Sequence, residues 1–200
     1  MGCKVKTTKN LIPEMQKTVE SINGKKVQVG VLEGEHQWLA AIHEYGCNIT
    51  PKNAQYLTVP ISPKAKGKRA ADFPDLFFVQ AKSGEKFLAL PKGENDMELI
   101  FWLTKSVKIP ERSFLRNGYD TNIEEVMKKA DIAMKQVLAG KMSEEKFLDL
   151  VGQTLSSKIK KFARDLSSPP NEYSTSEVKG SSNPLVDTGS MINGITWRVK

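Results

Sequence analysis

The chain has 200 residues, of which 39% are hydrophobic and 8% aromatic, which is enough for one domain with a buried core. Charged residues make up 26%, no stretch approaches the roughly 18 apolar residues of a membrane helix, and two cysteines, Cys3 and Cys47, are too few for a disulfide framework. The net charge of +7 points to acidic partners, with nucleic acid first among them.

The N-terminal quarter predicts two short helices on either side of a strand. Residues 1–11 are polar and lysine-rich, which is typical of a flexible arm. Residues 12–22 carry apolar side chains three or four positions apart, as in an amphipathic helix, and Asn23-Gly24 ends the pattern. Residues 27–31 alternate with period two, which indicates a strand with one buried face. Residues 36–45 predict a second helix. We expect its inward side chains to be Trp38, Leu39, Ile42 and Tyr45.

The middle of the chain predicts an antiparallel β-meander over residues 56–107. Pro60 in its first strand suits a sheet edge, because proline has no N–H to donate to a neighbouring strand. The segment 62–75 is rich in Lys, Ala, Gly and Pro, and we expect it to be a mobile basic loop. We expect the last strand before the helices to stop at Pro110, which also biases Ile109 toward an extended conformation.

Two long helices are predicted after the meander. The first is expected to begin at Thr121 or Asn122, either of which is a suitable cap. Phe114 and Leu115 then lie at the corner between sheet and helix, where we expect them to be buried. The second helix opens at the capping residue Ser143 and carries a long apolar stripe.

The C-terminal part predicts a flexible linker over 167–182, because this stretch is rich in Ser, Pro and Asn and poor in apolar residues. Residues 183–200 then predict a turn, a helical turn and a final strand, with the turn fixed by Asp187, Thr188 and Gly189. Asp187 or Thr188 is expected to cap the helical turn, and the final strand is expected to dock into the main sheet.

The predicted fold class is α+β. One antiparallel sheet, made of the meander and the C-terminal strand, packs against two long helices and a short N-terminal helix. The expected organisation is a flexible arm (1–11), a core domain (12–166), a flexible linker (167–182) and a C-terminal segment (183–200) that docks on the core sheet.

Catalytic and metal-binding patterns are weak. His36 and His43 are seven residues apart on one helix, about 10 Å along its axis, which is too far for one metal ion. Cys47 near His43 suggests a nucleophile pair, but the sequence places no Asn or Asp to orient the histidine. We therefore expect no catalytic residue, no cofactor and no metal, and a small hydrolase using Cys47 and His43 is the third functional hypothesis.

Three segments recur together in one known family. They are a strand ending in Val29-Gly30-Val31 with a helix ending in His43-Glu44-Tyr45-Gly46, the stretch Ile109–Arg116, and Asn183–Met191 with the strand after it. In this order they resemble the small virion-morphogenesis family of tailed bacteriophages and prophages, which includes Mu-like virion morphogenesis, neck, minor tail and tail-completion proteins. The residues that carry the resemblance are His43, Glu44, Tyr45, Gly46, Ile109, Pro110, Arg112, Phe114, Leu115, Asp187, Thr188 and Gly189.

The resemblance implies a non-enzymatic virion protein, made in the bacterial host cytoplasm and located at the head-tail junction or the upper end of the tail. Its implied partners are other copies of itself in a ring, adjacent head-completion and tail proteins and, non-specifically, DNA passing through the channel, but no membrane. Within it we expect His43, Glu44 and Tyr45 to form a structural polar cluster with Arg112. Arg112→Ala and Asp187→Ala are then expected to reduce folded yield or ring formation rather than turnover.

Two basic groups are candidate contacts to DNA or to an acidic partner. They are Lys64, Lys66, Lys68 and Arg69, then Lys158, Lys160, Lys161 and Arg164. Neither group contains interleaved aromatic residues that stack on bases, so a solvated charged surface is the simpler interpretation. A nucleic-acid-binding protein without sequence preference is nevertheless the alternative function, since phosphate contacts require only positive charge.

Overall fold

The computed structural model describes residues 10–94 and 96–200, so nearly all of the predicted arm 1–11 lies outside the described residues. The helices are α1 (Ile12–Ile22), α2 (Gln37–Tyr45), α3 (Phe114–Leu138), α4 (Glu144–Asp165), α5 (Tyr173–Lys179) and α6 (Ser190–Asn193), with 3-10 helices η1 (Pro63–Ala65) and η2 (Ala70–Asp72). The strands are β1 (Val27–Val31), β2 (Cys47–Ile49), β3 (Leu57–Pro60), β4 (Phe77–Gln80), β5 (Lys86–Pro91), β6 (Met97–Thr104), β7 (Val107–Ile109) and β8 (Ile195–Val199).

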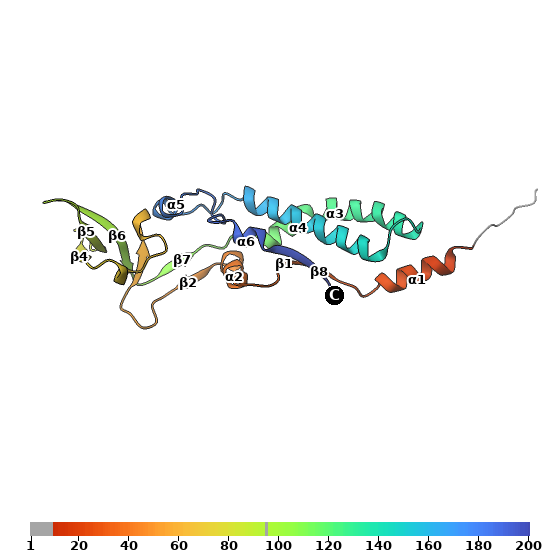
Figure 1. Ribbon diagram of the computed structural model, residues 1–200, viewed down its shortest axis with the longest axis horizontal. Helices are drawn as coiled ribbons and strands as arrows, with labels where there is room; N and C mark the ends of the chain where they lie inside the picture. Colours follow the sequence, from red (N-terminus) through yellow and green to blue (C-terminus); the bar gives the residue numbers. More distant parts are fainter. Residues whose placement is uncertain (1–9, 95) are drawn as a thin grey trace, which may run out of the picture.

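The described chain is elongated (Figure 1). The sheet containing β4, β5 and β6 lies at one end, the paired helices α3 and α4 lie toward the other, and α1 projects beyond them. The short β2–β7 ribbon connects the two ends. All strand pairs are antiparallel, and the predicted α+β class is confirmed. No helix within the described ranges is long and apolar enough to span a membrane.

Helices α3 and α4 lie side by side and supply much of the core. Their facing sides bury apolar residues spaced three or four positions apart, among them Val126, Leu155 and Ile159. Gly118 allows close approach, since a Cβ at this position would lie 3.4 Å from Ile159. Helix α3 begins at Phe114, so the start predicted at residues 121–122 is wrong. The carboxylate of Glu44, which is distant in the sequence, accepts hydrogen bonds from the first turn of this helix.

The final strand does not join the meander as predicted. Strand β8 pairs with β1 instead, with Val29 opposite Trp197, and this two-stranded sheet packs on α4. Where the two elements meet, a Cβ on Gly152 of α4 would lie 2.2 Å from Cδ1 of Trp197. The first and last strands of the described chain therefore cover the same helix, and the meander forms a separate sheet.

The meander is a four-stranded sheet in the order β3-β6-β5-β4. Strand β3 is at its edge, as predicted from Pro60. The segment 62–75 was expected to be a mobile loop, but it contains η1 and η2 and packs on β6. Its Ala65 is fully buried with Ile100 and Phe101, because the small side chain fits beneath the sheet.

The segment 167–182, expected to be a flexible linker, also contains a helix, α5. Lys179 connects the end of this segment to its neighbours: its carbonyl accepts from the Lys66 ammonium at 3.0 Å, and its own ammonium donates to the Pro184 carbonyl at 3.1 Å. These are polar contacts, which is why a search for apolar periodicity missed the fold of this stretch.

Helix α1 has no buried residue. Its apolar face is exposed, and we call the four residues Leu11, Ile12, Met15 and Val19 the α1 stripe. Ile12 is 62% exposed and Val19 54%, and contact with the core is made by Ile22 at the end of the helix.

Helix α2 presents only part of the predicted face to the core: Leu39 packs on it as predicted and Ile42 is half-buried. Ala40 and Glu44, four residues apart, are its buried positions, whereas Trp38 and Tyr45 are each 65% exposed. The prediction that Trp38 and Tyr45 point inward is therefore wrong. Burying the face that carries Glu44 turns the two aromatic side chains outward.

Candidate functional site

Glu44 is a buried carboxylate that binds the first turn of α3. It is 2% exposed, and its oxygens accept hydrogen bonds from Leu115 N (2.8 Å), Arg116 N (3.0 Å) and Arg116 Nε (2.9 Å). The first N–H groups of a helix have no acceptor within the helix, and negative charge is stabilising there. Ser113, the residue before the helix, provides no side-chain cap. Glu44 supplies this cap from another part of the chain and allows α3 to begin at Phe114.

Arg116, which the sequence analysis did not select, is the cationic partner of Glu44. Its guanidinium also donates to Glu111 Oε1 (2.7 Å) and lies 4.7 Å from the centre of the Tyr45 ring. Hydrogen bonds to Glu44 and then to Glu111 raise the pKa of Arg116. The exposed Tyr45 ring thus covers the guanidinium, and Glu44 and Tyr45 do belong to one cluster, although the arginine in it is not Arg112.

Gly46 fixes α2 against the chain that leads into α3. Its φ is +68°, and a Cβ there would lie 2.8 Å from Glu111 N and 2.9 Å from Ile109 O. Only glycine fits this conformation and this spacing. The next residue, Cys47, pairs with Ile109 in the β2–β7 ribbon, and Pro110 ends that ribbon as predicted.

Arg112 points away from Glu44 and binds the segment after α4. Its Nε donates to Pro169 O (2.8 Å), and its Nη2 donates to Pro170 O (2.9 Å) and Asn171 Oδ1 (3.4 Å). The residue is 5% exposed, and burial lowers the pKa of its guanidinium. Within residues 10–94 and 96–200, no carboxylate forms an ion pair with it. The expected side-chain cluster of Arg112 with Glu44 and Tyr45 is therefore wrong; backbone contact remains, through Arg112 N and His43 O at 2.7 Å.

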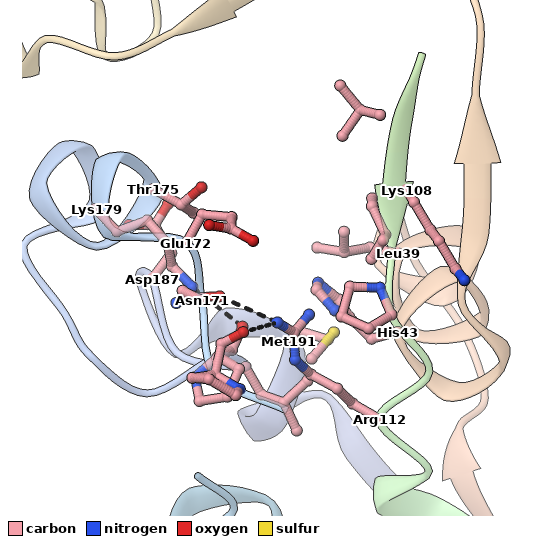
Figure 2. Close-up of a pocket in the computed structure, with 16 residues that line it drawn as sticks. Leu39, His43, Lys108, Arg112, Asn171, Glu172, Thr175, Lys179, Asp187 and Met191 are labelled. Carbon is pink, nitrogen blue, oxygen red and sulfur yellow. Dashed lines mark hydrogen bonds between the residues drawn. The ribbon is translucent and has the colours of Figure 1, made fainter. Parts of the chain in front are cut away.

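A cavity of about 420 Å³ opens beside Arg112, and we call it the Arg112 pocket. Figure 2 shows Leu39 and His43 on one side, Glu172, Thr175 and Lys179 on the other, and Lys108 extending away from the centre. Most of its wall is apolar. The apolar lining residues are Leu39, Val107, Ile109, Pro110, Pro170, Pro184, Leu185 and Met191.

His43 lies in this pocket with an unused ring nitrogen. Its Nδ1 is buried and has no hydrogen-bond partner in the part of the chain that the structure describes. Burial, followed by the positive charges of Arg112 and Lys179, lowers the pKa of the imidazole to about 4. The ring is therefore neutral at pH 7, and the potential around it is positive.

Lys179 is the second cation of the pocket. Burial is the main cause that lowers its pKa, with Arg112 and Lys66 adding to the effect and Asp187 opposing it. Sequence reasoning missed Lys179, because it lies in a stretch that has the composition of a linker. No sequence signal marked it, since its contacts are with backbone carbonyls rather than with a motif.

Asp187 and Thr188, which were both expected to fix the C-terminal turn, have different contacts in the structure. Thr188 Oγ1 accepts a hydrogen bond from Ser190 N (3.4 Å) at the start of α6, whereas Asp187 pairs with Lys66 at 3.0 Å. Gly189 has a φ of +80°, which favours glycine. Thr188 and Gly189 thus form the turn, and Asp187 connects it to η1.

Most of the Lys and Arg side chains predicted to contact DNA or an acidic partner interact with other residues of the same chain. In the first group, ion pairs join Lys64 to Glu98, Lys66 to Asp187 and Arg69 to Asp72, and Lys68 lies over the Phe73 ring. In the second, Lys158 pairs with Glu125, and Arg164 donates to Asn193. The first group lies around η1 and η2 and the second on α4, so the positive charge is dispersed, and four of the eight cations are paired with carboxylates. Nucleic-acid binding stays an alternative hypothesis.

The described residues hold no group of three or more His, Cys, Asp and Glu side chains arranged for a metal ion. No hydrogen bond joins Cys47 to His43 among them. Comparisons of the chain with protein-family models, with curated proteins and with solved structures give no match. What the site offers chemically is a buried guanidinium, a partly buried ammonium and a neutral imidazole beside an apolar wall.

Proposed function

We propose that this chain is a structural subunit of the head-tail connection of a tailed bacteriophage or prophage, which assembles into a ring and joins head and tail. The observation that carries the proposal is the α1 stripe, an apolar helix face that stays mostly exposed beside the end of α3. In this proposal the stripe docks on the adjacent copy in the ring, and neighbouring head-completion and tail proteins bind the ring.

The length of α1 supports an external partner. The helix has 11 residues, and isolated helices shorter than about 12–15 residues are marginal in water. Most helices in proteins are stabilised by packing their apolar face, and α1 packs mainly through its last residue, Ile22. Docking of the α1 stripe on another copy supplies the burial that this helix lacks.

An edge strand with exposed apolar side chains lies at the opposite end of the molecule. Phe77 (41% exposed) and Phe78 (55% exposed) are on β4, an edge strand of the four-stranded sheet. An exposed apolar edge strand favours association with another chain. The α1 stripe and strand β4 are two different exposed apolar elements on one subunit, as a head-to-tail interface requires. Such an interface closes into a ring when the rotation between copies permits it.

The three segments that resemble the virion-morphogenesis family also make one contact unit. Strand β1 pairs with β8, Glu44 binds the start of α3, and Gly46 packs on Ile109 and Glu111. Segments far apart in the sequence thus depend on one another for their conformation, as expected if the resemblance reflects one shared scaffold.

The experiment measures the mass of the purified full chain in solution over a range of concentrations, with electron microscopy of the same samples. Closed rings are expected for wild type, and monomers for the double variant Ile12→Ser/Val19→Ser. Lys17→Ser is the matched control, because it lowers helix propensity off the stripe and should leave the rings intact. A monomer at every concentration without rings, or normal rings from the double variant, contradicts the proposal.

A further inference from the structure

The Arg112 pocket contains a buried positive charge that no carboxylate of the described residues pairs with. Arg112 is 5% exposed, yet its side-chain partners are the carbonyls of Pro169 and Pro170 and the amide oxygen of Asn171. A cation removed from water is costly unless an anion or several hydrogen bonds compensate it. Its remaining nitrogen, Nη1, has no acceptor within the described residues.

Two further groups beside Arg112 have unused hydrogen-bonding capacity. The Lys179 ammonium donates to the carbonyls of Asn183 and Pro184 and carries three donors in all. The Nδ1 of His43 also has no hydrogen-bond partner within the described residues, but it is enclosed by the protein and is not open to a ligand in this conformation. An incoming oxygen acceptor therefore has Arg112 Nη1 and the third N–H of Lys179 as available donors.

The acidic residues of the wall limit the charge that the pocket tolerates. Asp187 is already paired with Lys66 at 3.0 Å. Glu172 also lines the pocket, on the side of α5 (Figure 2), and forms no ion pair with Arg112. A dianion such as phosphate would be repelled by these two carboxylates, whereas a single negative charge placed at Arg112 avoids most of that repulsion.

We propose that the Arg112 pocket binds a carboxylate carried on an aliphatic chain. The carboxylate is held by Arg112 and Lys179 beside the neutral ring of His43, and the aliphatic part packs against Leu39 and Met191. The volume of about 420 Å³ and the largely apolar wall are in the ordinary range of pockets for small ligands. This inference does not rest on ring assembly.

The test follows amide and side-chain NMR signals of the full chain during titration with hexanoate, with its uncharged analogue hexanamide, and with inorganic phosphate. Hexanoate should shift His43, Arg112 and Lys179 signals, and hexanamide and phosphate should bind at least about tenfold more weakly. Lys179→Met should raise the Kd for hexanoate by about tenfold. Lys82→Met, an exposed lysine in the β4–β5 turn, should leave it unchanged.

Equal binding of hexanoate and hexanamide, tighter binding of phosphate, or shifts confined to residues outside the pocket would overturn the inference. A second arm identifies where the carboxylate comes from in the assembled protein. If hexanoate lowers the mass of the assembly, an acidic side chain of the adjacent copy occupies the pocket; if the mass is unchanged, the ligand is a free acid. Both results support the same chemistry, and a failed ring assay leaves the NMR titration valid.

Discussion

Glu44→Ala is expected to remove the cap of α3 and to lower the free energy of unfolding by about 3 kcal/mol. The carboxylate accepts from two backbone N–H groups at a part-buried helix end, and a buried donor left without a partner costs about 1–3 kcal/mol. The ion pair with Arg116 adds only about 0.5 kcal/mol, because that arginine is 49% exposed. Glu44→Gln retains one oxygen acceptor and should cost about half as much, about 1.5 kcal/mol.

Urea unfolding followed by circular dichroism measures these differences, and hydrogen exchange at the amides of Leu115 and Arg116 shows whether the first turn has opened. Glu124→Gln, at an exposed position of the same helix, is the matched control and should change stability by less than about 0.5 kcal/mol. If Glu44→Ala stays within that limit, or the two amides keep their protection, the carboxylate does not determine where α3 begins.

Other expectations follow from the same contacts. Gly152→Ala should destabilise the protein by about 2 kcal/mol more than Gly118→Ala in urea unfolding, since its Cβ would overlap the Trp197 ring. The free energy of unfolding should fall as the pH is lowered from 6.5 to 4, because His43 is protonated in the unfolded chain over this range whereas burial holds its pKa at about 4 in the folded chain. After discounting for solvent screening, the loss is about 2 kcal/mol. A calorimetric pH series should show this loss for wild type and not for His43→Gln. Arg112→Ala should accelerate proteolytic cleavage in 167–182, with equal rates counting against the described contacts. Filter binding to duplex DNA should be weak, and a steep salt dependence would favour the nucleic-acid alternative.

Local patterns predicted the elements whose conformation depends on near neighbours. The apolar spacing of residues 12–22 gave α1 with its observed bounds, Pro110 marked the end of β7, and Ser143 caps α4 through Lys146 N. The same spacing could not reveal that α1 is uncovered, because periodicity identifies which face is apolar but not what packs on it.

Contacts between distant residues account for the failures. Glu44 caps an amide 71 positions further along the chain, and Arg112 binds a carbonyl 57 positions away. A buried charge leaves no periodic signal, so neither the early start of α3 nor the folding of 167–182 could be read from neighbouring residues. Likewise, apolar and polar residues alternate along β8 as predicted, but this pattern does not specify which strand it pairs with. The strand pairs with β1 rather than with the meander.

Pairing of β1 with β8 has a consequence during synthesis. Val27 emerges from the ribosome long before Val199, its partner, so the two-stranded sheet cannot close until residues 195–199 have been translated. Until then one flank of α4, including the surface around Gly152, has no cover and β1 has no hydrogen-bonding neighbour. A polypeptide interrupted before residue 195 would retain that uncovered surface, and we expect it to aggregate or to be degraded rather than to enter an assembly.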